Sequence, residues 1–165
     1  MYEGVKQTGG GARWYFLKSI RPGDPEPPEI PKNVATISPN FVKIYTQASD
    51  AEQHGLSEIC GGGYRKALEF LVKDFIISQA ESLGITGDQV KKASLGQCIE
   101  NYISDPLTKG VAERATWLGN DETHYFRKWV DKDINDLKNL IRLTMNAVDN
   151  HLLAHSYLAD MGEGK

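Results

Sequence analysis

The stretch that fixes the fold class is residues 134–155, INDLKNLIRLTMNAVDNHLLAH. Its apolar side chains recur every three or four residues, the spacing that places them on one face of an α-helix. The stripe covers about six turns and consists of Ile134, Leu137, Ile141, Thr144 or Met145, Val148, Leu152 and His155. We therefore predict a long amphipathic helix that begins near Asp131 and buries this stripe against other helices.

Two further helices are predicted in the first half of the chain. Ser38-Pro39, an N-cap followed by proline, predicts a helix that runs to Gly55. A second helical pattern ends at Gly84 and begins as early as Ser57 if the helix continues through Gly61-Gly62-Gly63. A break there is the alternative, since three glycines cost roughly 2–3 kcal/mol relative to alanine. We favour continuation, because glycines inside a helix allow another backbone to pack closely.

Two shorter helices are predicted between these and the final one. Ser94-Leu95-Gly96-Gln97 is a capping box that begins a helix extending through Ile103. Asp105-Pro106 begins another, which we expect to end at Gly119-Asn120, because both residues tolerate the left-handed conformation that ends helices.

Residues 1–33 differ in character from the rest. Residues 12–20, ARWYFLKSI, are dense in aromatic side chains and predict a strand that pairs with residues 5–8 across three glycines. Residues 21–31 contain five of the seven prolines and predict an extended strap. The expected fold is all-α: an antiparallel bundle of four to five helices over residues 34–165, with a small N-terminal β-ribbon and strap over residues 1–33.

The composition is that of an ordinary globular chain. Its 165 residues are 40% hydrophobic and 25% charged, and 19 Lys and Arg against 22 Asp and Glu give a net charge of −3. This balance excludes a strongly basic nucleic-acid coat protein, although it allows a local basic cleft. Cys60 and Cys98 form no disulfide framework or zinc motif, and no apolar run is long enough to span a membrane. We therefore expect a cytoplasmic protein.

The segment from Arg114 to Phe126 contains the first group of candidate site residues. Asn120 and the preceding glycine allow a sharp turn, Asp121 is placed to cap the following turn, and His124 lies about one turn further on. A histidine beside a tight turn and an arginine can act as acid, base or phosphate contact near pH 7. The alternative is a polar corner between helices, held by bonds from side chains to the backbone.

The second group lies on one helix face, where Arg65, Glu69 and Lys73 follow each other at intervals of four residues. On a solvated face they form ordinary ion pairs worth a few tenths of a kcal/mol each. If the face is turned into the bundle, Arg65 needs polar partners, and the corner from Asn120 to His124 is where we expect them.

No metal or cofactor site is predicted. His151 and His155 have a spacing that can hold a metal from one helix, but no carboxylate or third ligand is suggested, and their position near the end of a long helix explains them better. Neither glycine triplet follows a strand and leads into a phosphate-binding loop.

Two motifs together resemble a known family. Arg65-Lys66-Ala67-Leu68-Glu69, followed some fifty residues later by Leu118-Gly119-Asn120 and His124, is similar to the R-x-A-L-E helix and L-G-N-x-x-x-H turn of domain-of-unknown-function family 4145. The resemblance covers residues 30–150 or so. It implies a helical bundle of the HEPN superfamily, whose active members are metal-independent ribonucleases in toxin and phage-defence systems.

The resemblance has one departure at the expected catalytic signature. That signature is an arginine, four to six residues and then a histidine, often with a polar residue directly after the arginine. Asn120 matches the polar position and His124 the histidine, but Gly119 stands where the arginine is expected, and Arg114 is too far away in sequence. Glycine cannot stabilise the charge that develops on phosphate, a loss that commonly costs two to three orders of magnitude in rate.

Three functions therefore stay open at this stage. The first is a non-catalytic HEPN-like module that binds RNA, nucleotide or a protein partner, in phage defence or counter-defence. Its ligand-binding residues would be Arg65, Glu69, Arg114, Asn120, Asp121 and His124. The second is an active ribonuclease with His124 as general base and Arg65 as phosphate clamp. The third is a scaffold whose final helix forms the seam of a homodimer.

Overall fold

The computed structural model describes residues 25–161, and every regular element in that range is an α-helix. The all-α prediction is confirmed for this part of the chain, whereas the predicted β-ribbon falls outside the described residues. Four long helices form the body: α2 (Pro39–Gln53), α3 (Ser57–Ser78), α6 (Pro106–Asp121) and α7 (Ile134–Met161). Three short ones accompany them: α1 (Lys32–Ile37), α4 (Gly87–Lys92) and α5 (Leu95–Tyr102).

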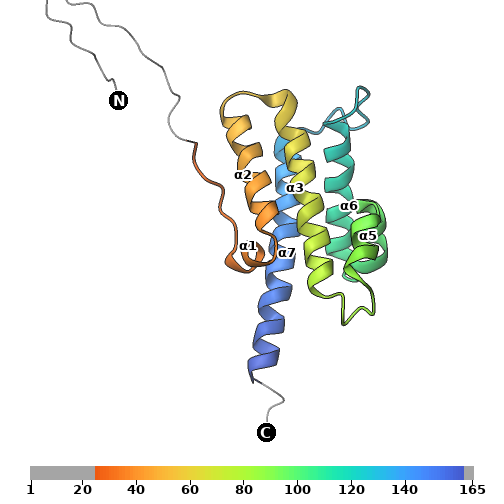
Figure 1. Ribbon diagram of the computed structural model, residues 1–165. Helices are drawn as coiled ribbons and strands as arrows, with labels where there is room; N and C mark the ends of the chain where they lie inside the picture. The colour runs from red at the N-terminus through yellow and green to blue at the C-terminus, as the bar shows by residue number, and fades with distance from the viewer. Residues whose placement is uncertain (1–24, 162–165) are drawn as a thin grey trace, which may run out of the picture.

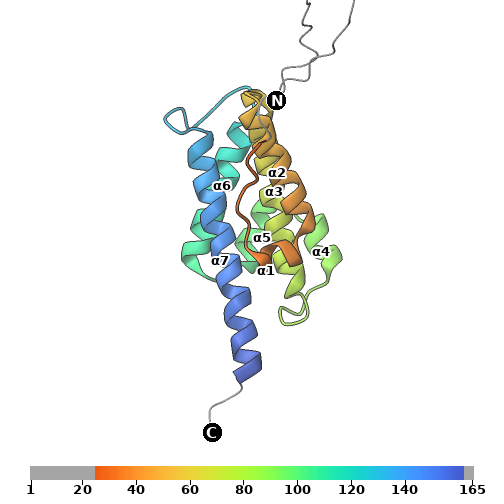
Figure 2. The ribbon, with the colours of Figure 1, turned by 90° about the vertical axis from the view of Figure 1, so that its left-hand side faces the viewer.

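The long helices pack as an antiparallel bundle with α3 at its centre (Figure 1). Helices α2 and α6 run in one direction, and α3 and α7 return in the other. The α2–α3 turn and the loop between α6 and α7 therefore lie at the same end of the molecule. Seen from the side, α7 continues well past the other helices at the opposite end (Figure 2).

Residues 25–31, the part of the proline-rich strap that the structure describes, run along the bundle before α1 begins (Figure 2). This part is tied to the end of α2, because the backbone N–H of Glu26 donates to Gln53 Oε1 (2.8 Å) and Gln53 Nε2 donates back to the Glu26 carbonyl (3.0 Å). Helix α1 follows directly and was not predicted, since its six residues are too few to show a period.

Side-chain caps define several helix starts. The capping box at Ser94 is confirmed, and Thr86 with Gln89 forms a second one that begins the unpredicted α4. The Asp105 carboxylate accepts from the Thr108 N–H (2.7 Å), as the Asp-Pro pair indicates. Ser38 is different, because its buried hydroxyl makes no cap and donates instead to Asp74 Oδ2 on α3 (2.5 Å).

The glycine triplet lies inside α3, so the favoured continuous helix is confirmed. A Cβ at Gly63 would lie 2.9 Å from the Ala48 Cβ on α2, and one at Gly61 would lie 2.5 Å from the Glu122 Cβ beyond α6. Two of the three glycines thus allow neighbouring segments to approach α3 more closely than any side chain would permit.

Two predicted helix ends are wrong. Helix α3 ends at Ser78, and a turn leads to Gly84, whose φ of +65° needs glycine. Helix α6 continues through Gly119 and Asn120 to Asp121, so these residues do not break it. Helix α7 begins at Ile134, after Asp133 Oδ1 has accepted from the N–H groups of Asn135 (2.8 Å) and Asp136 (3.1 Å).

A partly buried polar link adds to the apolar packing between the helices. Glu52 on α2 accepts from the Tyr64 hydroxyl on α3 (2.6 Å) and from Lys138 Nζ on α7 (2.8 Å). Burial and the hydrogen bond to this carboxylate both raise the pKa of Tyr64. No helix within residues 25–161 is long and apolar enough to cross a membrane.

The close approach of α2 to α3 can be tested with neighbouring glycines. Gly63→Ala should destabilise the protein by about 1–3 kcal/mol, because its methyl group overlaps a buried alanine and one helix must shift. Gly62→Ala is the matched control, since its Cβ meets only Thr123 Cγ2 at 3.5 Å, and helix propensity should stabilise it by up to about 1 kcal/mol. Urea unfolding followed by circular dichroism measures both, and equal effects would contradict the close approach.

Candidate functional site

The loop between α6 and α7, residues 122–133, is folded back onto the end of α6 by one buried carboxylate. Asp121 is the last residue of α6, and its Oδ2 accepts from the backbone N–H groups of Lys128 (2.8 Å) and Trp129 (2.7 Å). The sequence predicts that Asp121 caps the turn that directly follows it. This prediction is wrong, because the partners of Asp121 lie seven and eight residues further along the chain. Asp121 therefore shapes the whole loop.

Further polar contacts close the loop near its base. Arg127 Nη2 donates to Glu122 Oε1 (2.7 Å) and to the Lys132 carbonyl (3.2 Å). The Thr123 hydroxyl donates to the Asn120 carbonyl (2.9 Å). The loop is thereby held in shape, although nearly all of its side chains are exposed.

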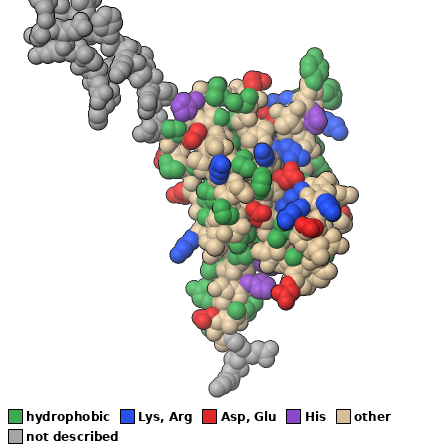
Figure 3. Space-filling model, in the orientation of Figure 1, with side chains coloured by type: hydrophobic (Ala, Val, Ile, Leu, Met, Phe, Trp, Pro, Cys, Tyr) green, Lys and Arg blue, Asp and Glu red, His purple; other side chains and the backbone are tan. Residues whose placement is uncertain are grey.

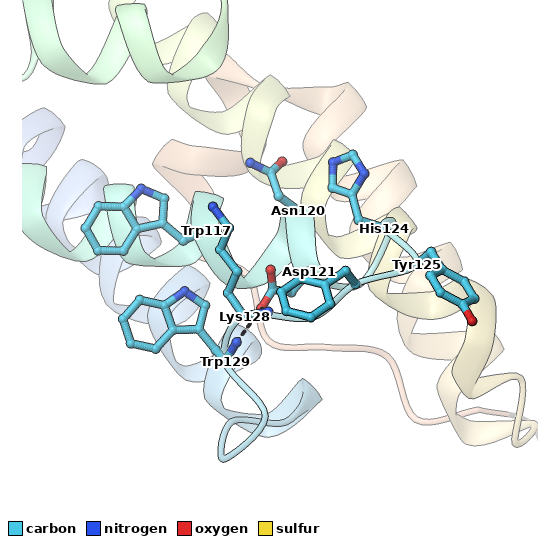
Figure 4. A pocket seen from close by; sticks show the side chains of 8 residues that line it. Trp117, Asn120, Asp121, His124, Tyr125, Lys128 and Trp129 are labelled. Carbon is cyan, nitrogen blue, oxygen red and sulfur yellow. Dashed lines mark hydrogen bonds between the residues drawn. The ribbon is translucent and has the colours of Figure 1, made fainter.

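A cavity of about 730 Å³ lies between the end of α6 and this loop (Figure 4). We call it the tryptophan cavity, and it is lined by Trp117, Asn120, Asp121, His124, Tyr125, Phe126, Lys128 and Trp129. The two tryptophan rings are parallel within 4°, and their centroids lie 6.1 Å apart. Trp117 is 43% exposed and Trp129 is 41% exposed. The cavity thus offers flat aromatic surfaces to solvent.

Cationic groups lie beside these rings. The Arg114 guanidinium lies over the Trp117 ring, 5.6 Å from its centroid, while its Nη1 donates to the Gly110 carbonyl (2.8 Å). Lys128 extends between Trp117 and Asp121 (Figure 4). Neither cation takes part in a salt bridge among residues 25–161. At this end of the molecule, Figure 3 shows hydrophobic side chains protruding beside a histidine and basic groups.

The Arg65 segment of α3 and the Asn120 segment of α6, which are distant in sequence, meet near the end of α6. Arg65 Nε on α3 donates to Asn120 Oδ1 (2.7 Å), and Arg65 Nη1 donates to Glu69 Oε2 (3.1 Å). Lys73 pairs with the other oxygen of Glu69 at 2.8 Å. Burial raises the pKa of Glu69, but the hydrogen bonds from Lys73 and Arg65 outweigh it, and the pKa stays below its ordinary value.

Gly119 is required by this contact. A Cβ there would lie 2.7 Å from the Arg65 Cγ and 2.8 Å from its Cβ, so the arginine stem occupies the space of a side chain. Gly119 therefore makes room for an arginine from another helix. Because Asn120 Oδ1 is taken by Arg65, the amide Nδ2 is left to donate elsewhere.

His124 lies on the exposed loop and borders two hollows. It lines the tryptophan cavity together with Asn120 and also a second hollow of about 500 Å³. Acidic side chains line that second hollow: Glu52, Glu58, Asp121, Glu122 and Asp133. Arg65 lines neither hollow and makes no hydrogen bond to His124 among the described residues.

The structure thus groups the candidate residues in two sets. Arg65, Glu69 and Asn120 form one hydrogen-bonded chain, and Asn120 is also a lining residue of the cavity with Asp121 and His124. Sequence reasoning missed Trp117, Lys128 and Trp129, because only the fold brings residues from α6 and from the loop together. The cluster of Tyr125, Phe126 and Trp129 in a polar stretch was the available signal.

No group of three metal-binding side chains occurs within residues 25–161. The rings of His151 and His155 lie 5.0 Å apart, and His151 meets the edge of Phe75. Burial lowers the pKa of His151, and the neighbouring His155 lowers it further.

Comparison of the chain with protein-family models, with curated proteins and with solved structures finds no match.

The role of Asp121 can be tested by limited proteolysis. Asp121→Ala leaves the N–H groups of Lys128 and Trp129 without their partner, a loss of about 1–3 kcal/mol of local stability. Tryptic cleavage after Arg127 or Lys128 should become several-fold faster. Asp131→Ala, at an exposed position in the same loop, is the matched control. Equal cleavage of both variants and the parent would show that Asp121 does not order the loop.

Proposed function

We propose that this protein binds single-stranded RNA in the tryptophan cavity and does not cleave it. The observation that carries the proposal is the parallel, half-exposed pair of Trp117 and Trp129 with cations at its edge. Proteins that bind single strands without strict sequence preference combine aromatic stacking platforms with positive charge.

The aromatic surfaces support binding of unpaired bases. A base in a duplex has both faces covered by its neighbours, whereas an unpaired base can lie flat on an exposed indole ring. Tyr125 and Phe126 enlarge the apolar area around the two tryptophans. A group of exposed aromatic side chains on one short loop is typical of a binding surface.

The cations support an anionic ligand at the same place. The chain as a whole carries a charge of −3, so a general attraction to nucleic acid is absent. Lys128, which lines the cavity, and Arg114, which lies over the Trp117 ring, supply positive charge locally for a phosphate next to a stacked base. Asn120 Nδ2 and the imidazole of His124 add hydrogen-bonding groups for a base edge or a ribose.

The contacts of Arg65 favour binding over cleavage. A ribonuclease of the kind that the resemblance implies needs an arginine directed at the scissile phosphate. Arg65 is instead engaged by Asn120 and Glu69 and lies outside the cavity that His124 lines. Its role in the proposal is to position the Asn120 amide.

Fluorescence anisotropy with a short labelled oligouridylate tests the proposal. Trp117→Ala and Trp129→Ala should each weaken binding by about 5- to 150-fold, which corresponds to about 1–3 kcal/mol of stacking per base. His124→Ala should weaken it less. Leu107→Ala is the matched control, because this side chain is 78% exposed on α6 but lies outside the cavity. Undiminished binding by the tryptophan variants would reject the cavity as the RNA site.

The salt dependence and an RNA cleavage assay give independent checks. A plot of log affinity against log salt concentration should become less steep by about 0.7 in Lys128→Ala, the value for the loss of one phosphate contact to a single strand. Incubation with mixed RNA in EDTA should leave the RNA intact. Cleavage that His124→Ala and Arg65→Ala both abolish would replace the proposal with a ribonuclease. A protein that binds no oligonucleotide would point to a protein ligand for the aromatic loop.

A further inference from the structure

Helix α7 is longer than the bundle that supports it. The last of its buried residues is Val148, and Leu152 is the last of those packed against the core. The helix nevertheless continues to Met161, and in Figures 1 and 2 the ribbon of its last turns extends beyond the other helices. These last turns gain no packing from the core, and packing of an amphipathic face is what stabilises most helices in proteins.

A second stripe of side chains runs along the outside of α7. It consists of Leu143, Ala147, Asn150, Ala154, Tyr157 and Met161. These residues follow each other at steps of four, three, four, three and four, the heptad spacing of a coiled-coil seam. At 3.6 residues per turn, the centre of this outer seam lies about 150° around the helix from the centre of the buried stripe. The outer seam therefore faces away from the bundle.

The outer face also lacks charge. On a helical wheel, the outer seam and its flanking residues Asn139, Asn146, Leu153 and Leu158 include no charged side chain. The charged residues between Asn139 and Met161 are Arg142, Asp149 and Asp160, and all three fall on one strip to the side. Asp149 is already engaged there, because its Oδ1 accepts from Asn33 Nδ2 on α1 (2.9 Å).

Exposure shows that this face is uncovered in the single chain. Tyr157 is 60% exposed, and Leu158 and Met161 are each 75% exposed. Hydrophobic side chains are visible on the projecting end in Figure 3. A helix face that meets only water normally carries charged and polar residues, so this composition indicates a partner.

We propose that a second copy of this chain covers the outer seam, with the two α7 helices antiparallel. An uncharged face suits pairing with itself, because no like charges meet and no oppositely charged partner is selected. A two-fold axis near residue 152 pairs position 143 with 161, 147 with 157, and 150 with 154. The small Ala147 then faces the large Tyr157, and the two bundles lie at opposite ends of the helix pair.

The size of the seam sets the expected strength. It spans nineteen residues, which is about 27 Å along the helix, and at a helix width of about 10 Å its footprint is well below the ~800 Å² per partner of a standard interface. The dimer should therefore be weak, with a dissociation constant in the micromolar range or above. It goes beyond the proposed RNA binding and does not depend on it.

Sedimentation equilibrium over a range from low micromolar to near-millimolar protein measures the association. The parent chain should show a concentration-dependent dimer. Tyr157→Glu and Met161→Glu should each weaken it at least tenfold, because a carboxylate would be buried in the seam. Leu107→Glu, at an exposed apolar position on α6, should leave it unchanged. A parent chain that stays monomeric throughout the range would overturn the proposal.

Disulfide trapping tests the direction of the helices. Both natural cysteines are buried, so introduced thiols report the contact without interference. A mixture of Leu143→Cys and Met161→Cys chains should form a crosslinked heterodimer under mild oxidation, and neither variant should crosslink with itself. Self-crosslinking of each variant alone, without the mixed product, would establish a parallel pair and reject the proposed arrangement.

Discussion

The stem of Arg65 lying across Gly119 is the contact on which the site depends. It brings α6 against α3, and it places the guanidinium where it can hold the Asn120 oxygen. Any larger residue at position 119 would overlap the arginine stem, so one glycine fixes both the helix spacing and the direction of the amide. Gly61, one turn earlier on α3, likewise leaves space for a neighbouring side chain, that of Glu122 at the start of the α6–α7 loop.

Local signals in the sequence were sufficient for the four long helices and for α5, whereas α1 and α4 were not predicted. The period of residues 134–155 predicted α7, and the Ser94 capping box and the Asp105-Pro106 pair predicted the starts of α5 and α6. These features act within four residues, so they can be read without the fold. The positions at which the helices end were harder to predict from the sequence. Gly119 was expected to stop a helix, because nothing local shows that an arginine fifty-four positions earlier packs against it.

One part of the candidate site could be predicted from the sequence and the other part could not. The pairing of Arg65 with the corner at Asn120 was predicted as a condition of burying that helix face, and the hydrogen bond between them bears this out. The cavity was not predicted, since its walls come from α6 and from a loop whose path is set by Asp121. A carboxylate that bonds backbone groups seven and eight residues ahead leaves no pattern in side-chain identity.

The hydrogen bonds between Glu26 and Gln53 have a practical consequence for biosensor design. They anchor the strap at the end of the bundle where the tryptophan cavity opens, whereas α7 leaves from the far end. A fluorophore attached at Glu26 would therefore lie at the same end of the bundle as the cavity. A protein immobilised on a chip through its last helix would present the cavity outward, but the same tether would shield the outer face of α7.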